Sequence, residues 1–225
     1  LWQIAKDLQK CDSVLQAETL IAETNSSSLG SPLVQQAFLE TTEPILKNLK
    51  EREELKDVVT RDPLTELHNR RFMETELCRQ IDAIQGHKTP LSLAMIDLDH
   101  FRVYNRRHGH ISGDRMLQTI ASLLLKLLSN SCIPCRYGGE EFAIILTDSK
   151  VESAAVVAER IRQLAQRLEV EHEGQTIQFT ISIGLAQFER DFKGSMAWLE
   201  LADQALYEAK ENGRNQYRVF EAITL

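Results

Sequence analysis

The sequence predicts an α/β domain with a mixed central β-sheet flanked by helices, preceded by an α-helical stalk. From Asp62 onward, helical patterns of apolar residues alternate with short apolar runs that are typical of buried strands. Gly138-Gly139 stands directly before one such run and indicates a hairpin between antiparallel strands. Because 225 residues correspond to one full domain and a smaller segment, we expect a helical region at residues 1–60 and the α/β domain at residues 61–225.

The first 60 residues predict two helices. Apolar residues at helical spacing indicate a first helix from Trp2 to about Ala22, and the polar run 25–31 ends it. Ser31-Pro32 is a typical helix start, with serine as the N-cap and proline at the first helical position. A long helix is therefore expected over 33–59, with a kink at Pro44.

The long helix carries a broken heptad repeat, which allows two interpretations of equal weight. The helix forms a parallel coiled coil with a second copy, or it is amphipathic and packs on its own domain. The positions that recur every 3.5 residues are Phe38, Thr41, Ile45, Asn48, Arg52, Leu55 and Val59.

Helices and strands alternate through the second region. The apolar periodicities place the helices at 70–84, 116–127, 151–168 and 196–211, and Gly213 is a candidate C-cap for the last of them. The expected strands lie at 91–96, 142–146 and 176–186.

Acidic residues follow the first of these strands and the glycine pair. Alternation puts Asp97 and Asp99 on one side of the strand end, and the hairpin sequence 138–142 carries two adjacent glutamates. Two acidic residues in an isolated Asp-x-Asp sequence more often belong to a solvated loop. Four carboxylates that face each other need a cation, and Mg²⁺ takes hard oxygen ligands together with substrate phosphates. The glycines allow positive φ and let a nucleotide approach the backbone.

The hairpin sequence Gly138-Gly139-Glu140-Glu141-Phe142 resembles the signature of the GGDEF family, the diguanylate cyclases. Further motifs match in order: 62–65 with 69–71, Asp97-Leu98-Asp99-His100-Phe101, Asn105 with 109–110 and 113–114, 182–184, and 203–215. The resemblance covers about residue 61 to the C-terminus. It implies a palm-like fold that condenses two GTP molecules into cyclic dimeric GMP and releases two pyrophosphates. Each protomer then holds one GTP, so that a head-to-tail homodimer is required.

The resemblance also implies roles for individual residues. Asp97, the Leu98 carbonyl and Glu140 would hold Mg²⁺, with Mn²⁺ as an alternative ion, and Glu141 would complete the acidic cluster. Which group deprotonates the attacking ribose hydroxyl is left open. The implied substrate-binding residues are Phe101, Arg102, Gly138, Gly139, Lys210 and Arg214 around the triphosphate, and Asn105 and Asp114 at the guanine edge. Taken singly, these polar residues are also ordinary helix-terminal or turn residues.

Some positions depart from the family pattern. Arg102 stands where lysine is usual, Arg106 where aspartate is common, and Glu66 where the opening motif has glycine. The family's product-inhibition site is an Arg-x-x-Asp, and the matching positions here read Ser129-Asn130-Ser131-Cys132. The loss of the guanidinium and the carboxylate predicts weak or absent feedback inhibition. Cys132 and Cys135 have C-x-x-C spacing without a second pair for zinc, so we expect structural cysteines on a strand.

The composition of the chain excludes some classes of ligand and location. The formal net charge of −7 argues against a nucleic-acid ligand, and hence against a palm-type polymerase-like enzyme, because phosphate backbones require clustered basic residues. No apolar run approaches the roughly 18 residues needed to span a membrane. The four cysteines and the absence of a signal sequence at this start favour the cytoplasm.

Two functions remain after these exclusions. The favoured one is an active cyclase, because Asp97, Glu140 and Glu141 are all present. The alternative is a catalytically inactive module that acts as a GTP receptor or as a dimerisation domain. Residues 1–60 resemble the signalling helices that precede such domains, and we expect them to set the dimer geometry or to dock a regulatory protein.

Overall fold

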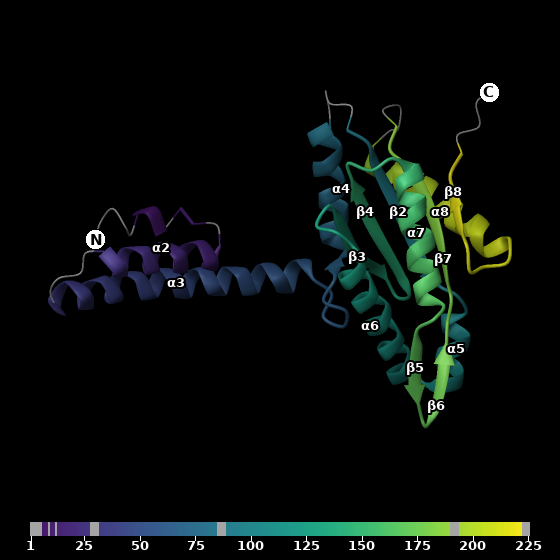
Figure 1. Cartoon of the computed structure of the whole chain (residues 1–225), viewed down its shortest axis with the longest axis horizontal. Coiled ribbons are helices and arrows are strands. Elements are labelled where there is room, and N and C mark those ends of the chain that lie inside the picture. The colour runs from purple at the N-terminus through teal and green to yellow at the C-terminus, as the bar shows by residue number, and fades with distance from the viewer. Residues whose placement is uncertain are drawn as a thin grey trace. The chain divides into compact units, whose positions relative to one another are not determined.

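The computed structural model describes residues 6–8, 10–11, 13–27, 32–84, 89–189 and 194–221. These residues form two compact units, 1–60 and 61–225 (Figure 1). The second unit contains the sheet and every predicted site residue. It has the mixed α/β architecture, with a central sheet flanked by helices, that the sequence predicts.

The first unit is a helical pair, α2 (Val14–Ser27) and α3 (Pro32–Thr60). The first helix, α2, begins later and ends later than the range from Trp2 to about Ala22 that its periodicity predicted. Residues 6–8 form a separate helical turn, and the serines at 26–27 still belong to α2. Residues 1–5 and 28–31 lie outside the described residues. The start of α3 at Pro32 and the position of Pro44 inside it agree with the sequence.

The apolar face of α3 packs within its own unit over its first part. Phe38 is 1% exposed, and Leu49 is buried in a small cluster with Leu8 and Ala17. Near the end of the helix, Val59 is 48% exposed. The packing of α3 on its own unit is thus present in the structure. A coiled coil between two copies stays a prediction.

The second unit is built on a mixed sheet whose described strands have the order β1-β3-β4-β2-β7-β8. The two outer pairs, β1 with β3 and β7 with β8, are parallel, and the inner pairs are antiparallel. The elements are β1 (His68–Asn69), α4 (Arg70–Ile84), β2 (Leu91–Leu98), α5 (Phe101–His108), α6 (His110–Leu127), β3 (Cys132–Gly138), β4 (Glu141–Thr147), α7 (Val151–Ala165), β5 (Glu169–His172), β6 (Gln175–Gln178), β7 (Ile181–Gln187), α8 (Ser195–Glu211) and β8 (Tyr217–Val219).

Helices cover both faces of the sheet, which explains why its central strand, β2, is buried along its whole length (Figure 1). Along β2, Ala94 and Ile96 pack on the side of α6 and α7, and Leu93 and Met95 pack on the side of α4 and α8. Asp97 continues the second set. Its side chain is therefore directed toward the C-terminal part of α8.

One predicted strand is wrong in its extent. The segment 176–186 is divided between β6, which pairs with β5 in a separate two-stranded sheet, and β7, which pairs with β2. β5 and β6 are joined by a turn at Glu173 and Gly174, both with positive φ. The apolar alternation belongs to β7 alone, because only this strand is covered by helices on both faces. The helix expected over 151–168 ends at Ala165.

Candidate active site

Two neighbouring strands bring the predicted acidic residues together at one end of the sheet. Asp97 of β2 stands opposite Glu141 of β4 in the antiparallel register. Glu140 lies in the turn between β3 and β4, and its carbonyl accepts a hydrogen bond of 3.3 Å from the Leu98 amide. The hairpin is thus joined to the strand that carries Asp97, and the three carboxylates face a common space.

This space is a cavity of about 520 Å³, and most of the predicted site residues line it. It is a polar cavity that combines carboxylates and cationic side chains. Its lining consists of Asp97, Leu98, His100, Phe101, Arg102, Val103, Gly139, Glu140, Glu141, Lys210 and Arg214.

The hairpin glycines have no side chain and so leave space beside this cavity. Neither Gly138 nor Gly139 has a positive φ, so the positive φ that glycine allows is not used there. A Cβ atom on Gly139 would meet no atom within 4 Å, and one on Gly138 would lie 3.4 Å from a Glu141 carboxylate oxygen. Gly139 therefore leaves open space at the cavity wall, where a substrate can approach the backbone.

Lys210 is the internal cation of the acidic cluster. Its Nζ lies 2.9 Å from Oδ2 of Asp97, and Asp97 is only 8% exposed. Burial raises the pKa of Asp97 to about 6, against the lowering effect of Lys210, and the nearby charges of Glu140 and Glu141 add to the rise. The site therefore holds more negative charge than its single partly buried lysine stabilises.

Two arginines add positive charge at the cavity. Arg102 is the more exposed, with 91% of its side chain accessible, and its Nε lies 3.5 Å from a Glu140 carboxylate oxygen. Arg214 follows α8 and has no ion-pair partner among the described residues. The Arg214 guanidinium is accordingly available to an anionic ligand, and the exposed Arg102 lies at the cavity beside Glu140.

The donor set fits Mg²⁺. Asp97, Glu140 and the Leu98 carbonyl offer only oxygen atoms, which is the ligand type that this ion prefers. Among the described residues, no group of three or more histidine, cysteine or acidic side chains is arranged so that it could hold a metal ion. A magnesium ion here would complete its coordination with water and substrate phosphates, as it usually does in proteins.

The two predicted guanine-binding residues lie outside this lining. Asn105 is on α5, and its buried Oδ1 has no hydrogen-bond partner among the described residues. A Cβ atom on Gly113 would lie 1.9 Å from that oxygen, so glycine is required for this approach of α6 to α5. Asp114, the next residue, is exposed. The pair thus combines an unused buried acceptor with a solvent-accessible carboxylate.

An arginine that the sequence analysis did not single out holds the hairpin. Nη1 of Arg136 lies 2.9 and 3.1 Å from the two carboxylate oxygens of Asp62, and its Nη2 donates to the Gly139 carbonyl at 2.9 Å. Burial raises the pKa of Asp62, but hydrogen bonds from Thr65 and Arg136 outweigh it and hold this pKa below its usual range. The signal in the sequence was an arginine two residues before the glycines.

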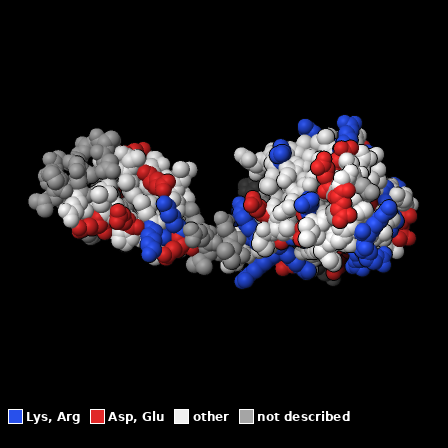
Figure 2. Space-filling model, turned by 90° about the horizontal axis from the view of Figure 1, so that it is seen from below, with Lys and Arg blue, Asp and Glu red and all other residues white. Residues whose placement is uncertain are grey.

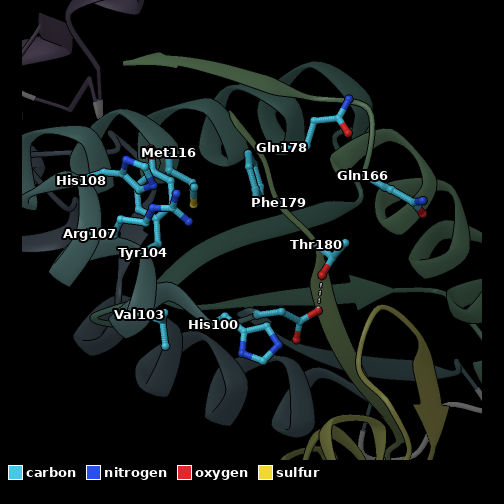
Figure 3. Close-up of a pocket in the computed structure, with 11 residues that line it drawn as sticks. His100, Val103, Tyr104, Arg107, His108, Met116, Gln166, Gln178, Phe179 and Thr180 are labelled. Carbon is cyan, nitrogen blue, oxygen red and sulfur yellow. Dashed lines mark hydrogen bonds between the residues drawn. The ribbon is translucent and has the colours of Figure 1, made fainter. Parts of the chain in front are cut away.

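Asp99 does not join the acidic cluster. Its carboxylate accepts hydrogen bonds from Thr180 Oγ1 at 2.7 Å, Ser182 Oγ at 2.7 Å and the Asn215 amide at 3.0 Å. It lines a second cavity of about 400 Å³, which adjoins the first because His100 belongs to both linings. In Figure 3 the cavity lies between the helix that carries labelled Tyr104 and the segment of labelled Thr180.

The segment Ser129–Cys132, which was expected to replace a product-inhibition motif, is closed by its own hydrogen bonds. Ser129 Oγ lies 2.8 Å from Ser131 Oγ, and the Cys132 amide donates to the Ser129 carbonyl. The two cysteines of the C-x-x-C sequence are free thiols on β3. Burial raises the pKa of Cys135 to about 12, so this thiol is neutral and inert near pH 7.

The matching family model is described as "Diguanylate cyclase, GGDEF domain", and residues 59–216 match it. The chain belongs to the GGDEF domain family. A related protein, diguanylate cyclase A of Treponema denticola, is 36% identical over 166 residues, which cover 72% of this chain and 45% of that protein. The probable diguanylate cyclase DgcT of Escherichia coli is 38% identical over 170 residues and is covered to 37%. The chain thus spans less than half the length of these relatives.

Solved GGDEF structures share the fold. The coiled coil and GGDEF domain of DgcB from Caulobacter crescentus, in complex with c-di-GMP, has a TM-score of 0.75 and 27% identity over 83% of this chain and 98% of that one. The diguanylate cyclase SiaD of Pseudomonas aeruginosa, in complex with its activator SiaC, has a TM-score of 0.69 and 30% identity over 90% of this chain and 79% of that one. Both matches extend into the helical region, because each covers more of the chain than residues 61–225 alone.

The surface and the helices bear on two further expectations. On the face of the GGDEF domain shown in Figure 2, acidic and basic side chains are intermixed and neither sign covers it. A phosphate backbone would require a continuous basic surface. None of the described helices is both long and apolar enough to cross a membrane.

Proposed function

We propose that this GGDEF domain is an active diguanylate cyclase that condenses two GTP molecules into cyclic di-GMP and two pyrophosphates. The observation that carries the proposal is the convergence of Asp97, Glu140 and Glu141 with Lys210 and Arg214 on one cavity. A domain that served only as a scaffold would have no need for three carboxylates in a partly buried space, because their mutual repulsion opposes folding.

Each side of the cavity has a separate task in this proposal. Arg102, Lys210 and Arg214 bind the triphosphate, for which their charges are suited. Asp97, Glu140 and the Leu98 carbonyl would hold Mg²⁺, which would neutralise developing charge on the phosphates when bound. The protein then contributes chiefly the positioning of the ribose hydroxyl and the α-phosphate.

The guanine end of the substrate is bound by α5 and α6. The unpartnered Oδ1 of Asn105 is an acceptor for a base N–H group, and the exposed carboxylate of Asp114 accepts from the N1–H and N2–H₂ groups of guanine. Adenine offers no donor at N1, so this pair selects GTP over ATP.

The reaction requires a homodimer. Among the described residues, one cavity carries the acidic and cationic side chains proposed to bind GTP. The product contains two nucleotides joined by two phosphodiester bonds. Two copies meeting head to tail place the ribose hydroxyl of each GTP at the α-phosphate of the other. The rate per protomer should accordingly rise with protein concentration at concentrations where the dimer dissociates.

We further propose that residues 1–60 regulate this dimer, as a stalk or as a docking site for an activator. The similarity to SiaD supports this proposal, because that match covers 90% of the chain and the matched cyclase was crystallised with its activator. A chain that begins at Arg61 tests it. If that chain were as active per protomer as the longer one at low concentration, residues 1–60 would have no such role.

Incubation with GTP and Mg²⁺, followed by chromatography of the nucleotides, tests the activity. We expect cyclic di-GMP from the parent and none from Glu140→Gln or Glu141→Gln. Glu152→Gln, an exposed acid in the first turn of α7, is the matched control and should retain activity. Mg²⁺-dependent GTP binding without product, with and without an activator, would contradict the cyclase and indicate a GTP receptor.

A further inference from the structure

Asp99 is the second acid of the Asp97-Leu98-Asp99 sequence. Its carboxylate accepts hydrogen bonds from three donors among the described residues. It is 8% exposed and does not line the cavity of Asp97. Two of its donors are the Thr180 and Ser182 hydroxyls of the β7 region (Figure 3 shows the bond to Thr180). The third is the backbone amide of Asn215 at 3.0 Å.

The Asn215 amide belongs to a turn with an unfavourable backbone. Gly213, Arg214 and Asn215 follow one another with φ values of 110°, 61° and 46°. Left-handed conformations are costly for residues other than glycine, and such a turn persists only when its surroundings fix it. The Asn215 side chain is fixed as well, because its Oδ1 accepts from Arg162 Nη1 at 2.8 Å.

This turn sets the direction of Arg214, which lines the substrate cavity. We propose that Asp99 is a positioning residue, which holds the Asn215 amide and thereby aims the Arg214 guanidinium at the triphosphate. The inference rests on the proposed GTP site. The two acids then divide the work: Asp97 acts within the cavity, and Asp99 orients a cation from outside it.

Titration with 3′-deoxy-GTP and Mg²⁺ tests this role, because that nucleotide lacks the attacking hydroxyl and cannot turn over. Loss of one charge-assisted contact weakens binding about 10-fold or more. We expect Asp99→Ala to approach the loss caused by Arg214→Ala, and the double variant to bind no worse than Arg214→Ala alone. Unchanged binding in Asp99→Ala, or a double variant in which the two losses multiply, would overturn the proposal.

Two further variants separate positioning from a loosened fold. Asp99→Asn keeps an oxygen that accepts from the Asn215 amide and from Thr180, and the Ser182 hydroxyl can reverse its direction to accept from the new NH₂ group, so binding should be retained. Ser182→Ala removes a different donor and leaves the Asn215 contact in place. A loss of binding in either variant as large as in Asp99→Ala would contradict the assignment.

Amide hydrogen exchange tests the anchor without nucleotide. In the parent protein, the Asn215 amide should exchange far more slowly than exposed turn amides, and in Asp99→Ala it should lose this protection. Rapid exchange in the parent would overturn the proposal even if Asp99→Ala did not fold. If the parent bound no GTP at all, the proposed function would fail, and the exchange result would still decide whether Asp99 anchors the Asn215 amide.

Discussion

Lys210 Nζ lies 2.9 Å from Asp97 Oδ2, so a residue predicted to bind phosphate also neutralises the acid predicted to bind metal. The side chains of Lys210 and Asp97 are 29% and 12% exposed. Without a divalent ion, Lys210 is the cation that pairs with Asp97 among the residues that the structure describes. The raised pKa of Asp97 shows that ionising this acid in the folded domain is unfavourable, so the acidic cluster lowers the free energy of unfolding.

The stability of the ion-free domain should fall as the pH rises from about 4 to about 6. Because the pKa of Asp97 is raised from 3.8 to about 6, the folded state binds this proton more tightly than the unfolded chain. Ionisation then removes at most about 3 kcal/mol. Urea unfolding in EDTA should show the fall in the parent and not in Asp97→Asn. Glu200→Gln, an exposed change on α8, should keep the parent's dependence, and a fall that persisted in Asp97→Asn would refute the assignment.

Arg136→Met should destabilise the domain and reduce turnover. The substitution leaves the Asp62 carboxylate without its cation and releases the Gly139 carbonyl, which we estimate at about 2–4 kcal/mol. Turnover should fall more than GTP affinity, because Glu140 follows Gly139 directly. Denaturant unfolding and steady-state kinetics measure the two effects. Arg71→Met, an exposed arginine on α4, is the control, and equal effects of the two variants would argue against this role.

Glu66→Gly should stabilise the domain. Glu66 is exposed and has a φ of 62°, the left-handed conformation that glycine adopts without strain. The gain should be about 1 kcal/mol, measured as a shift in the denaturation midpoint. The same change at Glu208, within α8, should cost about as much, because glycine is unfavourable inside a helix. A loss of stability in Glu66→Gly would show that the glutamate side chain compensates for the strain.

Added cyclic di-GMP should inhibit this protein only weakly. The segment Ser129–Cys132 offers no guanidinium and no carboxylate, so at saturating GTP the rate should fall less than about twofold. Initial rates at several product concentrations measure this. Ser129→Arg combined with Cys132→Asp should introduce non-competitive inhibition. Strong non-competitive inhibition of the parent, with a nucleotide bound at Ser129–Cys132, would contradict the prediction.

Element bounds were predicted best where the burial of one apolar face decides the local structure. The helix over 70–84 has the predicted bounds, because its amphipathic period fixes which face is buried. The strand over 176–186 was predicted as one because periodicity does not reveal which partner a strand pairs with. The break before Ile181 follows from the pairing of β6 with β5 and of β7 with β2.

The motifs of this sequence determined the family, the acidic cluster and the cations that face it, because these depend on residue types at fixed spacing. The tertiary structure alone decided how those groups are used. It pairs Lys210 with Asp97, joins Arg136 to the hairpin and turns Asp99 away to hold Asn215. Such contacts join residues up to 116 positions apart in the chain, and only the folded sheet brings them within hydrogen-bonding distance.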